Sequence, residues 1–169
     1  MSTAQLRVAI ADDDRSMREV LTQMLRNLGH EVVAIAENGR SLIEQCATAH
    51  PDVVITDNLM PDMRGVDVAA EIYSCQGTPV ILLSGYCDRE VVLDAEQSHV
   101  LLYLVKPISE PILEVALSGC RSRAEQHSDG DDTRSEQVEV LVSAVRARED
   151  APAQSRFTPP YRQIRRRPR

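Results

Sequence analysis

Residues 7–29 read RVAIADDDRSMREVLTQMLRNLG, and they join one candidate strand to one candidate amphipathic helix. The segment 7–11 is short and mostly apolar, which is typical of a buried strand. Beyond it, apolar residues recur at helical spacing and form one stripe: Met17, Val20, Leu21, Met24, Leu25 and Leu28. We expect that helix to end at Gly29. Three consecutive aspartates, residues 12–14, stand at the junction between the strand and the helix.

The same unit of a strand followed by a helix occurs five times along the chain. The expected strands are 7–11, 32–36, 53–56, 80–84 and 100–105, and the helices that follow them are 17–28, 41–49, 66–75, one within 88–98, and 109 to about 119. Strands that are apolar throughout and separated by helices predict a parallel sheet covered on both faces. The sequence therefore predicts an α/β domain with a doubly wound, five-stranded parallel sheet, the flavodoxin-like (βα)5 arrangement.

Composition limits the class of protein. The 169 residues amount to one domain and an appendage, and 43% hydrophobic with 27% charged residues excludes a wholly disordered chain. The longest apolar runs are about six residues, well short of the roughly 20 that cross a bilayer. With no membrane segment and no signal peptide expected, we predict a cytoplasmic protein. The four cysteines lack a C-x-x-C pair, and we expect reduced thiols.

The C-terminal part has a different composition. We divide the chain into a domain at 1–121, a polar linker at 122–132, an amphipathic helix at 133–149 and a tail at 150–169 that is rich in Arg and Pro and expected to be disordered. The helix either folds back onto the domain or makes a dimer contact. Six arginines and no acids lie in 151–169, whereas the rest of the chain has a net charge of −13. Nucleic-acid binding is therefore expected only through residues 156–169, where a solvated tail is the alternative.

Polar residues follow three of the expected strands and end a fourth. The first strand is followed by Asp12 and Asp13, the third by Asp57 and the fifth by Lys106, while the fourth ends at Ser84. Ligands of such sheets bind beyond the carboxyl ends of the strands. Clustered carboxylates suit Mg²⁺, and Asp57 can then attack a phosphoryl group whose oxygens contact Lys106 and Ser84.

Helix capping is a simpler explanation for the aspartates. It accounts for Asp14 alone, but it does not account for a lone Asp57 together with the Lys106-Pro107 pair. The joint placement of these residues favours a site that forms an acyl phosphate.

Four motifs carry a resemblance to a known family: VAIADDD at 8–14, DNLMPDMRG at 57–65, LLSG at 82–85 and YLVKP at 103–107. Over residues 5–120 the chain resembles the receiver domain of two-component response regulators. The resemblance implies a phosphoacceptor, Asp57, and a Mg²⁺ site made by Asp12, Asp13, Asp57 and the main-chain carbonyl of Leu59. It also implies that Ser84 is the switch hydroxyl, that Lys106 binds the phosphoryl group, that Tyr103 turns inward on activation and that the Lys106–Pro107 bond is cis.

The resemblance also implies partners. A sensor histidine kinase or a phosphotransfer protein would supply the phosphoryl group, and the domain would catalyse only its own phosphotransfer and slow dephosphorylation. A homodimer through the face made by the fourth helix, the fifth strand and the fifth helix stays open. His99 stands before the fifth strand, where the family usually has Gly, so it must tolerate any left-handed backbone there.

Two other functions compete with phosphoryl signalling through protein contacts. A transcriptional or RNA-level regulator would use the basic tail to bind phosphates without reading sequence. A metal-dependent phosphohydrolase with an Asp nucleophile needs a second Asp two residues later as general acid, and Leu59 occupies that position.

Overall fold

The computed structural model describes residues 5–85 and 98–126. Four expectations lie outside these residues: most of the fourth helix, the rest of the linker beyond 126, the helix at 133–149 and the tail at 150–169. The described elements are β1 (Arg7–Ala11), α1 (Arg15–Asn27), β2 (Glu31–Ala36), α2 (Gly39–Ala49), β3 (Val53–Asp57), α3 (Gly65–Gln76), β4 (Val80–Ser84), β5 (Val100–Val105) and α5 (Glu110–Gln126).

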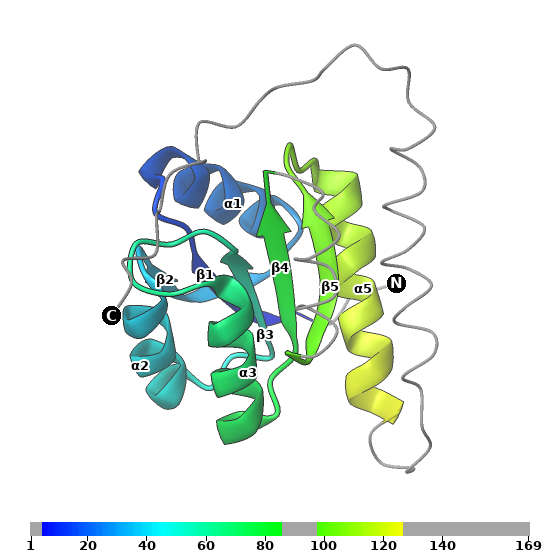
Figure 1. The fold of residues 1–169 in the computed structure, drawn as a ribbon. Helices are drawn as coiled ribbons and strands as arrows, with labels where there is room; N and C mark the ends of the chain where they lie inside the picture. The colour runs from blue at the N-terminus through cyan, green and yellow to red at the C-terminus, as the bar shows by residue number, and fades with distance from the viewer. Residues whose placement is uncertain (1–4, 86–97, 127–169) are drawn as a thin grey trace, which may run out of the picture.

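The five strands form one parallel sheet in the order β2-β1-β3-β4-β5 (Figure 1). This order places β1 and β3 in the centre, with β4 beside β3. The polar residues after these strands therefore gather at one edge of the sheet. The structure confirms the predicted doubly wound α/β fold.

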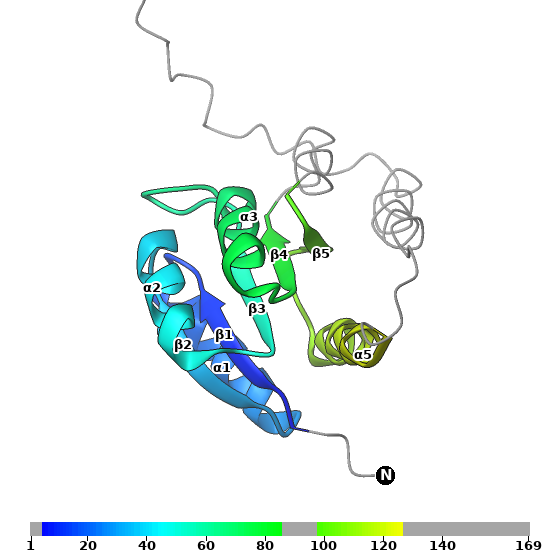
Figure 2. The same ribbon diagram turned by 90° about the horizontal axis from the view of Figure 1, so that it is seen from below.

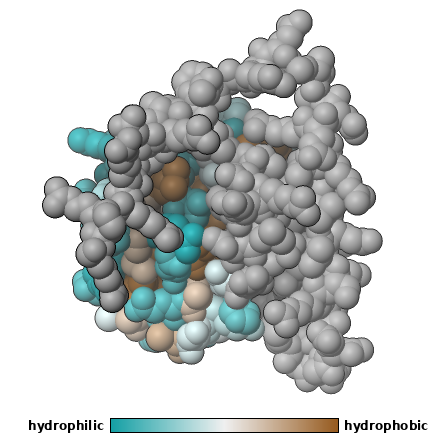
Figure 3. Space-filling model, viewed as in Figure 1, coloured by the Kyte–Doolittle hydropathy of each residue, from teal (hydrophilic) through white to brown (hydrophobic). Residues whose placement is uncertain are grey.

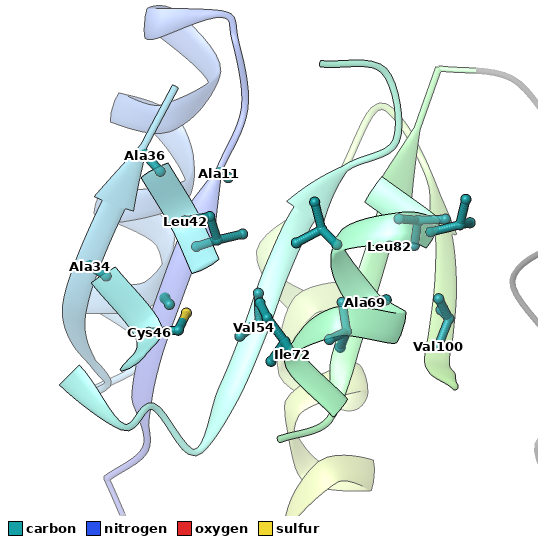
Figure 4. Close-up of a cluster of buried hydrophobic side chains, with 14 of the residues drawn as sticks. Ala11, Ala34, Ala36, Leu42, Cys46, Val54, Ala69, Ile72, Leu82 and Val100 are labelled. Atoms are coloured by element: carbon teal, nitrogen blue, oxygen red, sulfur yellow. The ribbon is translucent and has the colours of Figure 1, made fainter. Parts of the chain in front are cut away.

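Helices cover both faces of the sheet, as Figure 2 shows along the layers. On one face α2 and α3 bury Leu42, Cys46, Val66, Ala69 and Ile72 against the sheet (Figure 4). On the other face α1 and α5 bury Leu21, Leu25, Leu113, Ala116 and Leu117. Burying a Leu or Ile side chain contributes about 1.5–3 kcal/mol, so the apolar stripes hold the helices to the sheet.

The predicted ends of the described elements lie within two residues of those in the structure, except at the end of α5. β3 extends by one residue to include Asp57, and α2 begins at Gly39 because Asn38 accepts the Ser41 amide proton as its cap. α5 continues to Gln126, so the predicted end near Gly119 is wrong and residues 122–126 of the predicted linker are helical. Gly29, which does follow the end of its helix, has a φ of +80°, whereas Gly119 has no positive φ.

The edge strand β2 is partly closed by a side chain from α2. The Gln45 amide accepts a hydrogen bond from the Ile35 N–H at 3.2 Å and donates one to the Ile35 carbonyl at 3.1 Å. A glutamine thus takes the place of a neighbouring strand at Ile35, whose side chain is exposed. On the surface coloured in Figure 3, hydrophobic and hydrophilic residues interleave. Within the described residues, no helix is both long and apolar enough to span a bilayer.

Candidate functional site

A lysine and two aspartates meet at the carboxyl edge of the sheet. The Lys106 ammonium lies 2.7 Å from Asp12 Oδ2 and 2.6 Å from Asp57 Oδ1. Asp12 is 1% exposed and Asp57 is 6% exposed. The Lys106 N–H also donates to the Ser84 carbonyl, which ties the end of β5 to the end of β4. Three residues singled out from the sequence are therefore in direct contact, although 94 positions separate Asp12 from Lys106.

The charges of this cluster are unequal, because one ammonium faces two carboxylates. Burial raises the pKa of Asp57 above its usual range; the hydrogen bond and charge of Lys106 and the Leu59 amide oppose this rise, and the Asp12 charge adds to it. Burial works to lower the pKa of Lys106, but its hydrogen bonds to Asp12 and Asp57 and their charges outweigh burial and raise it. The ammonium thus stays protonated. It balances only one of the two carboxylates, so the cluster can still attract a further positive charge.

The loop after β3 holds the Asp57 carboxylate from its second oxygen. Asp57 Oδ2 accepts the Leu59 N–H at 2.7 Å, and Leu59 pairs with Arg64 in an isolated antiparallel bridge. Gly65 packs against the end of β3, where an added Cβ would meet the Asp57 carbonyl oxygen and lie 2.9 Å from Asn58 Cα. The sequence therefore needs glycine here to bring α3 onto the site.

The same loop is attached to α2 by Asp62. Its two carboxylate oxygens accept the Gly39 and Arg40 amide protons at 2.9 and 2.8 Å. Burial works to raise the pKa of Asp62, but hydrogen bonds from the Arg40, Gly39, Asp62 and Met63 amides together lower it below its usual range. Asp62 was not predicted from the sequence, because its partners lie 22 and 23 residues earlier in the chain.

The loop after β1 is held from α1. Asp14 caps α1 by accepting the Ser16 N–H, as the capping explanation predicted for this residue. Asp12 Oδ1 accepts the Asp14 N–H at 2.9 Å, so both Asp12 oxygens have partners. Arg18 Nη1 donates to the Asp12 and Asp13 carbonyl oxygens at 2.7 and 3.1 Å. Sequence reasoning missed Arg18, whose only signal is its position one turn into the helix.

The residues assigned to the switch lie under the same edge. Ser84 is 4% exposed at the end of β4. Tyr103 is 2% exposed and belongs to the core cluster on the α2 and α3 face. The Lys106–Pro107 bond is cis, as the resemblance implied. His99 has a φ of +58°, and its ring stacks on Tyr73 with centroids 4.3 Å apart.

The donor set suits a hard cation with few protein ligands. Across residues 5–85 and 98–126, no three acidic, His or Cys side chains converge into a metal-binding group. Mg²⁺ is nevertheless usually held by one or two carboxylates and completes its shell with water. The buried Asp12 and Asp57 carboxylates, which share one ammonium, have that chemistry, so the residues present fit the ion.

Comparison with known proteins identifies the family of the chain. Residues 8–118 match the response regulator receiver domain. The chain is 38% identical over 119 residues to the transcriptional regulatory protein PdtaR of Mycobacterium tuberculosis, covering 68% of this chain and 58% of that protein. It is 29% identical over 129 residues to the DNA-binding response regulator MtrA of Mycobacterium bovis, covering 76% of this chain and 55% of the relative. It thus spans a little over half the length of these relatives.

Solved structures show the same architecture. The signal receiver domain of the putative response regulator NarL from Mycobacterium tuberculosis superposes with a TM-score of 0.67 at 30% identity, over 72% of this chain and 100% of that chain. Chemotaxis protein CheY4 of Vibrio cholerae superposes with a TM-score of 0.63 at 27% identity, over 68% of this chain and 98% of that chain. With its motifs, sheet order and charged edge in agreement, the chain belongs to the response regulator receiver domain family of two-component systems.

Proposed function

We propose that this receiver accepts a phosphoryl group on Asp57 from a sensor histidine kinase or a phosphotransfer protein in the cytoplasm. The observation that carries the proposal is the Lys106 ammonium, which lies between the Asp57 and Asp12 carboxylates at 2.6 and 2.7 Å. An acidic nucleophile held beside a permanent cation at the carboxyl edge of a parallel sheet suits phosphoryl transfer.

The two oxygens of Asp57 have different roles in this reaction. Oδ2 accepts the Leu59 N–H and Oδ1 contacts the Lys106 ammonium, and we assign the new bond to phosphorus to Oδ1, the oxygen beside the cation. The donor leaves with the electrons of its own bond to phosphorus, and Asp57 becomes an acyl phosphate. Lys106, which contacts Oδ1 beforehand, then pairs with the phosphoryl oxygens. The domain would otherwise catalyse only its own slow dephosphorylation.

The proposed ligands of Mg²⁺ are the carboxylates of Asp12, Asp13 and Asp57 and the main-chain carbonyl of Leu59. When bound, the ion would neutralise the carboxylates and the charge on the phosphoryl oxygens. Asp12 is already fixed by its contacts with Lys106 and the Asp14 amide, so its position costs little further ordering.

Intact mass after treatment with acetyl phosphate and Mg²⁺ tests the assignment. The wild type should gain one phosphoryl group, and Asp57→Asn should gain none. Asp67→Asn is the matched control, since Asp67 is an exposed acid of α3 that pairs with Arg64. Undiminished labelling of Asp57→Asn would show that another residue accepts the phosphoryl group.

We propose that Ser84 relays phosphorylation to Tyr103 and the surface of β5 and α5. Phosphorylation adds about −1.5 to −2 charges, which draw a hydroxyl and an ammonium toward the new group. Ser84→Ala should keep the label on Asp57 but weaken the change in hydrogen exchange over residues 98–118 when a beryllofluoride phosphoryl mimic is added. Equal responses in both proteins would exclude Ser84 as the relay.

A second output is supported by the relatives, whose names describe a transcriptional regulator and a DNA-binding regulator. Here it would depend on the six arginines within 156–169. A salt-dependent gel shift that is lost when the chain is ended at residue 150 would support nucleic-acid binding. A shift that persists in the shortened chain would place binding elsewhere.

A further inference from the structure

We propose that Arg18 is a positioning residue that holds the acidic loop after β1 in the shape that binds Mg²⁺. This inference rests on the proposed function of the site. A single guanidinium nitrogen, Nη1, donates to two successive main-chain oxygens, 2.7 Å from the Asp12 carbonyl and 3.1 Å from the Asp13 carbonyl. These are the peptide oxygens of two residues whose carboxylates we assign to the metal.

The contact fixes the backbone from which both carboxylates extend. Two neighbouring carbonyl oxygens that approach one point repel each other unless a donor lies between them. Arg18 supplies that donor with a permanent charge, because a guanidinium does not deprotonate in proteins. Asp12 is buried and held through both carboxylate oxygens, but Asp13 is exposed, so the hydrogen bond to its carbonyl restrains the residue with the less buried side chain.

Arg18 is itself anchored in α1. Its amide donates to the Asp14 carbonyl at 3.1 Å, and its own carbonyl accepts the Thr22 hydroxyl at 2.7 Å. Thr22 is buried, so its hydrogen bond fixes the backbone of Arg18, from which the guanidinium side chain extends. The Arg18 side chain is therefore fixed to α1 at its backbone and carries its charge at the loop. Both properties are needed to hold the loop against the mutual repulsion of its aspartates.

Arg18 affects a bound cation in two opposite ways: it positions the ligands, and its own charge repels the ion. The direction in which Mg²⁺ affinity changes when Arg18 is removed shows which effect is larger. The contacts of Arg18 within the described residues are to carbonyl oxygens, so the carboxylates keep their charge for the ion. A role in positioning strengthens Mg²⁺ binding, whereas a bare positive charge near the site weakens it. Removing Arg18 should weaken binding if positioning dominates and strengthen it if repulsion dominates.

The experiment measures Mg²⁺ affinity by calorimetry on the full chain in four proteins: wild type, Arg18→Met, Arg18→Lys and Arg26→Met. Arg26 is the matched control, an exposed cation in the last turn of the same helix. We expect the dissociation constant to rise about tenfold in Arg18→Met, since loss of a residue that supports metal ligands costs 10–100-fold. The dissociation constant of Arg18→Lys should lie between those of wild type and Arg18→Met. The dissociation constant of Arg26→Met should stay within about twofold of the wild-type value.

Unchanged or tighter Mg²⁺ binding by Arg18→Met would overturn the proposal. Urea unfolding in chelator reports separately on the fold, and if Arg18→Met does not unfold cooperatively, Arg18→Lys decides. Weaker binding by Arg18→Lys than by wild type then supports positioning, and equal or tighter binding refutes it. Failure of the wild type to bind Mg²⁺ would instead contradict the proposed function.

Discussion

Replacing Lys106 with Met tests whether this ammonium holds the acidic edge together. The change leaves the buried Asp12 and Asp57 carboxylates without the cation that both contact. At an effective dielectric constant of about 20, each pair at this distance attracts by about 6 kcal/mol before desolvation is subtracted. Breaking a buried pair by removing one partner costs about 3–5 kcal/mol. Because the Lys106 side chain is 20% exposed, we expect the lower end, about 3 kcal/mol, in chelator.

The loss should depend on pH and on Mg²⁺. Burial raises the pKa of Asp57, so the folded state binds this proton more readily than the unfolded state, and losing Lys106 increases that difference. Stability then falls as pH rises through the interval between the two pKa values, so Lys106→Met should lose less at about pH 5 than at about pH 8. Mg²⁺ at ten times its dissociation constant should return about 1.4 kcal/mol.

Urea unfolding of the wild type, Lys106→Met and Arg40→Met is the assay. Arg40 is the control because its pair with Glu71, at 3.6 Å, is exposed and is expected to contribute less than about 0.5 kcal/mol. A loss below about 1 kcal/mol in Lys106→Met, or the same loss at both pH values, would refute the reasoning.

Three further outcomes follow from the described contacts. Gly65→Ala should lower stability by about 2–3 kcal/mol in urea unfolding, because its Cβ would meet the backbone at the end of β3. Asp62→Ala should lower the free energy of unfolding by about 1 kcal/mol at neutral pH, as loss of a helix cap does. Because folding lowers the pKa of Asp62, this difference in stability should disappear as the carboxyl protonates in acid. A difference that stays constant with pH would contradict the assignment. Cys46, where burial raises the pKa to about 11, should resist alkylation in the native state while the exposed Cys75 reacts, as peptide mass mapping can show.

The central contacts of the site were predictable from the sequence. Parallel strands end at one edge, so Asp12, Asp57 and Lys106 had to come together once the strands were identified. The contacts of Arg18 and Asp62 were not predictable in the same way. Arg18 binds main-chain oxygens of a loop and Asp62 binds main-chain amides in the first turn of α2, and a pattern of side chains does not determine where those groups lie.

The end of α5 shows a different limit. A glycine was expected to stop the helix near residue 119, but it does so only where the backbone turns left-handed, as at Gly29 and Gly77. Within a helix glycine costs only about 1 kcal/mol, and the residues after it continue the helix to Gln126.

The pairing of Gln45 with Ile35, next to the end of β2, bears on how this molecule behaves at high concentration. An edge strand with an exposed Ile35 can pair with a strand of another molecule, and repeated pairing of that kind leads to filaments. Here an invading strand would first have to displace two amide hydrogen bonds, at 3.1 and 3.2 Å. Substitution of Gln45 would therefore lower solubility before it affected phosphoryl chemistry. Gln45 thus protects a signalling domain, which works through reversible contacts, from irreversible association through its edge strand.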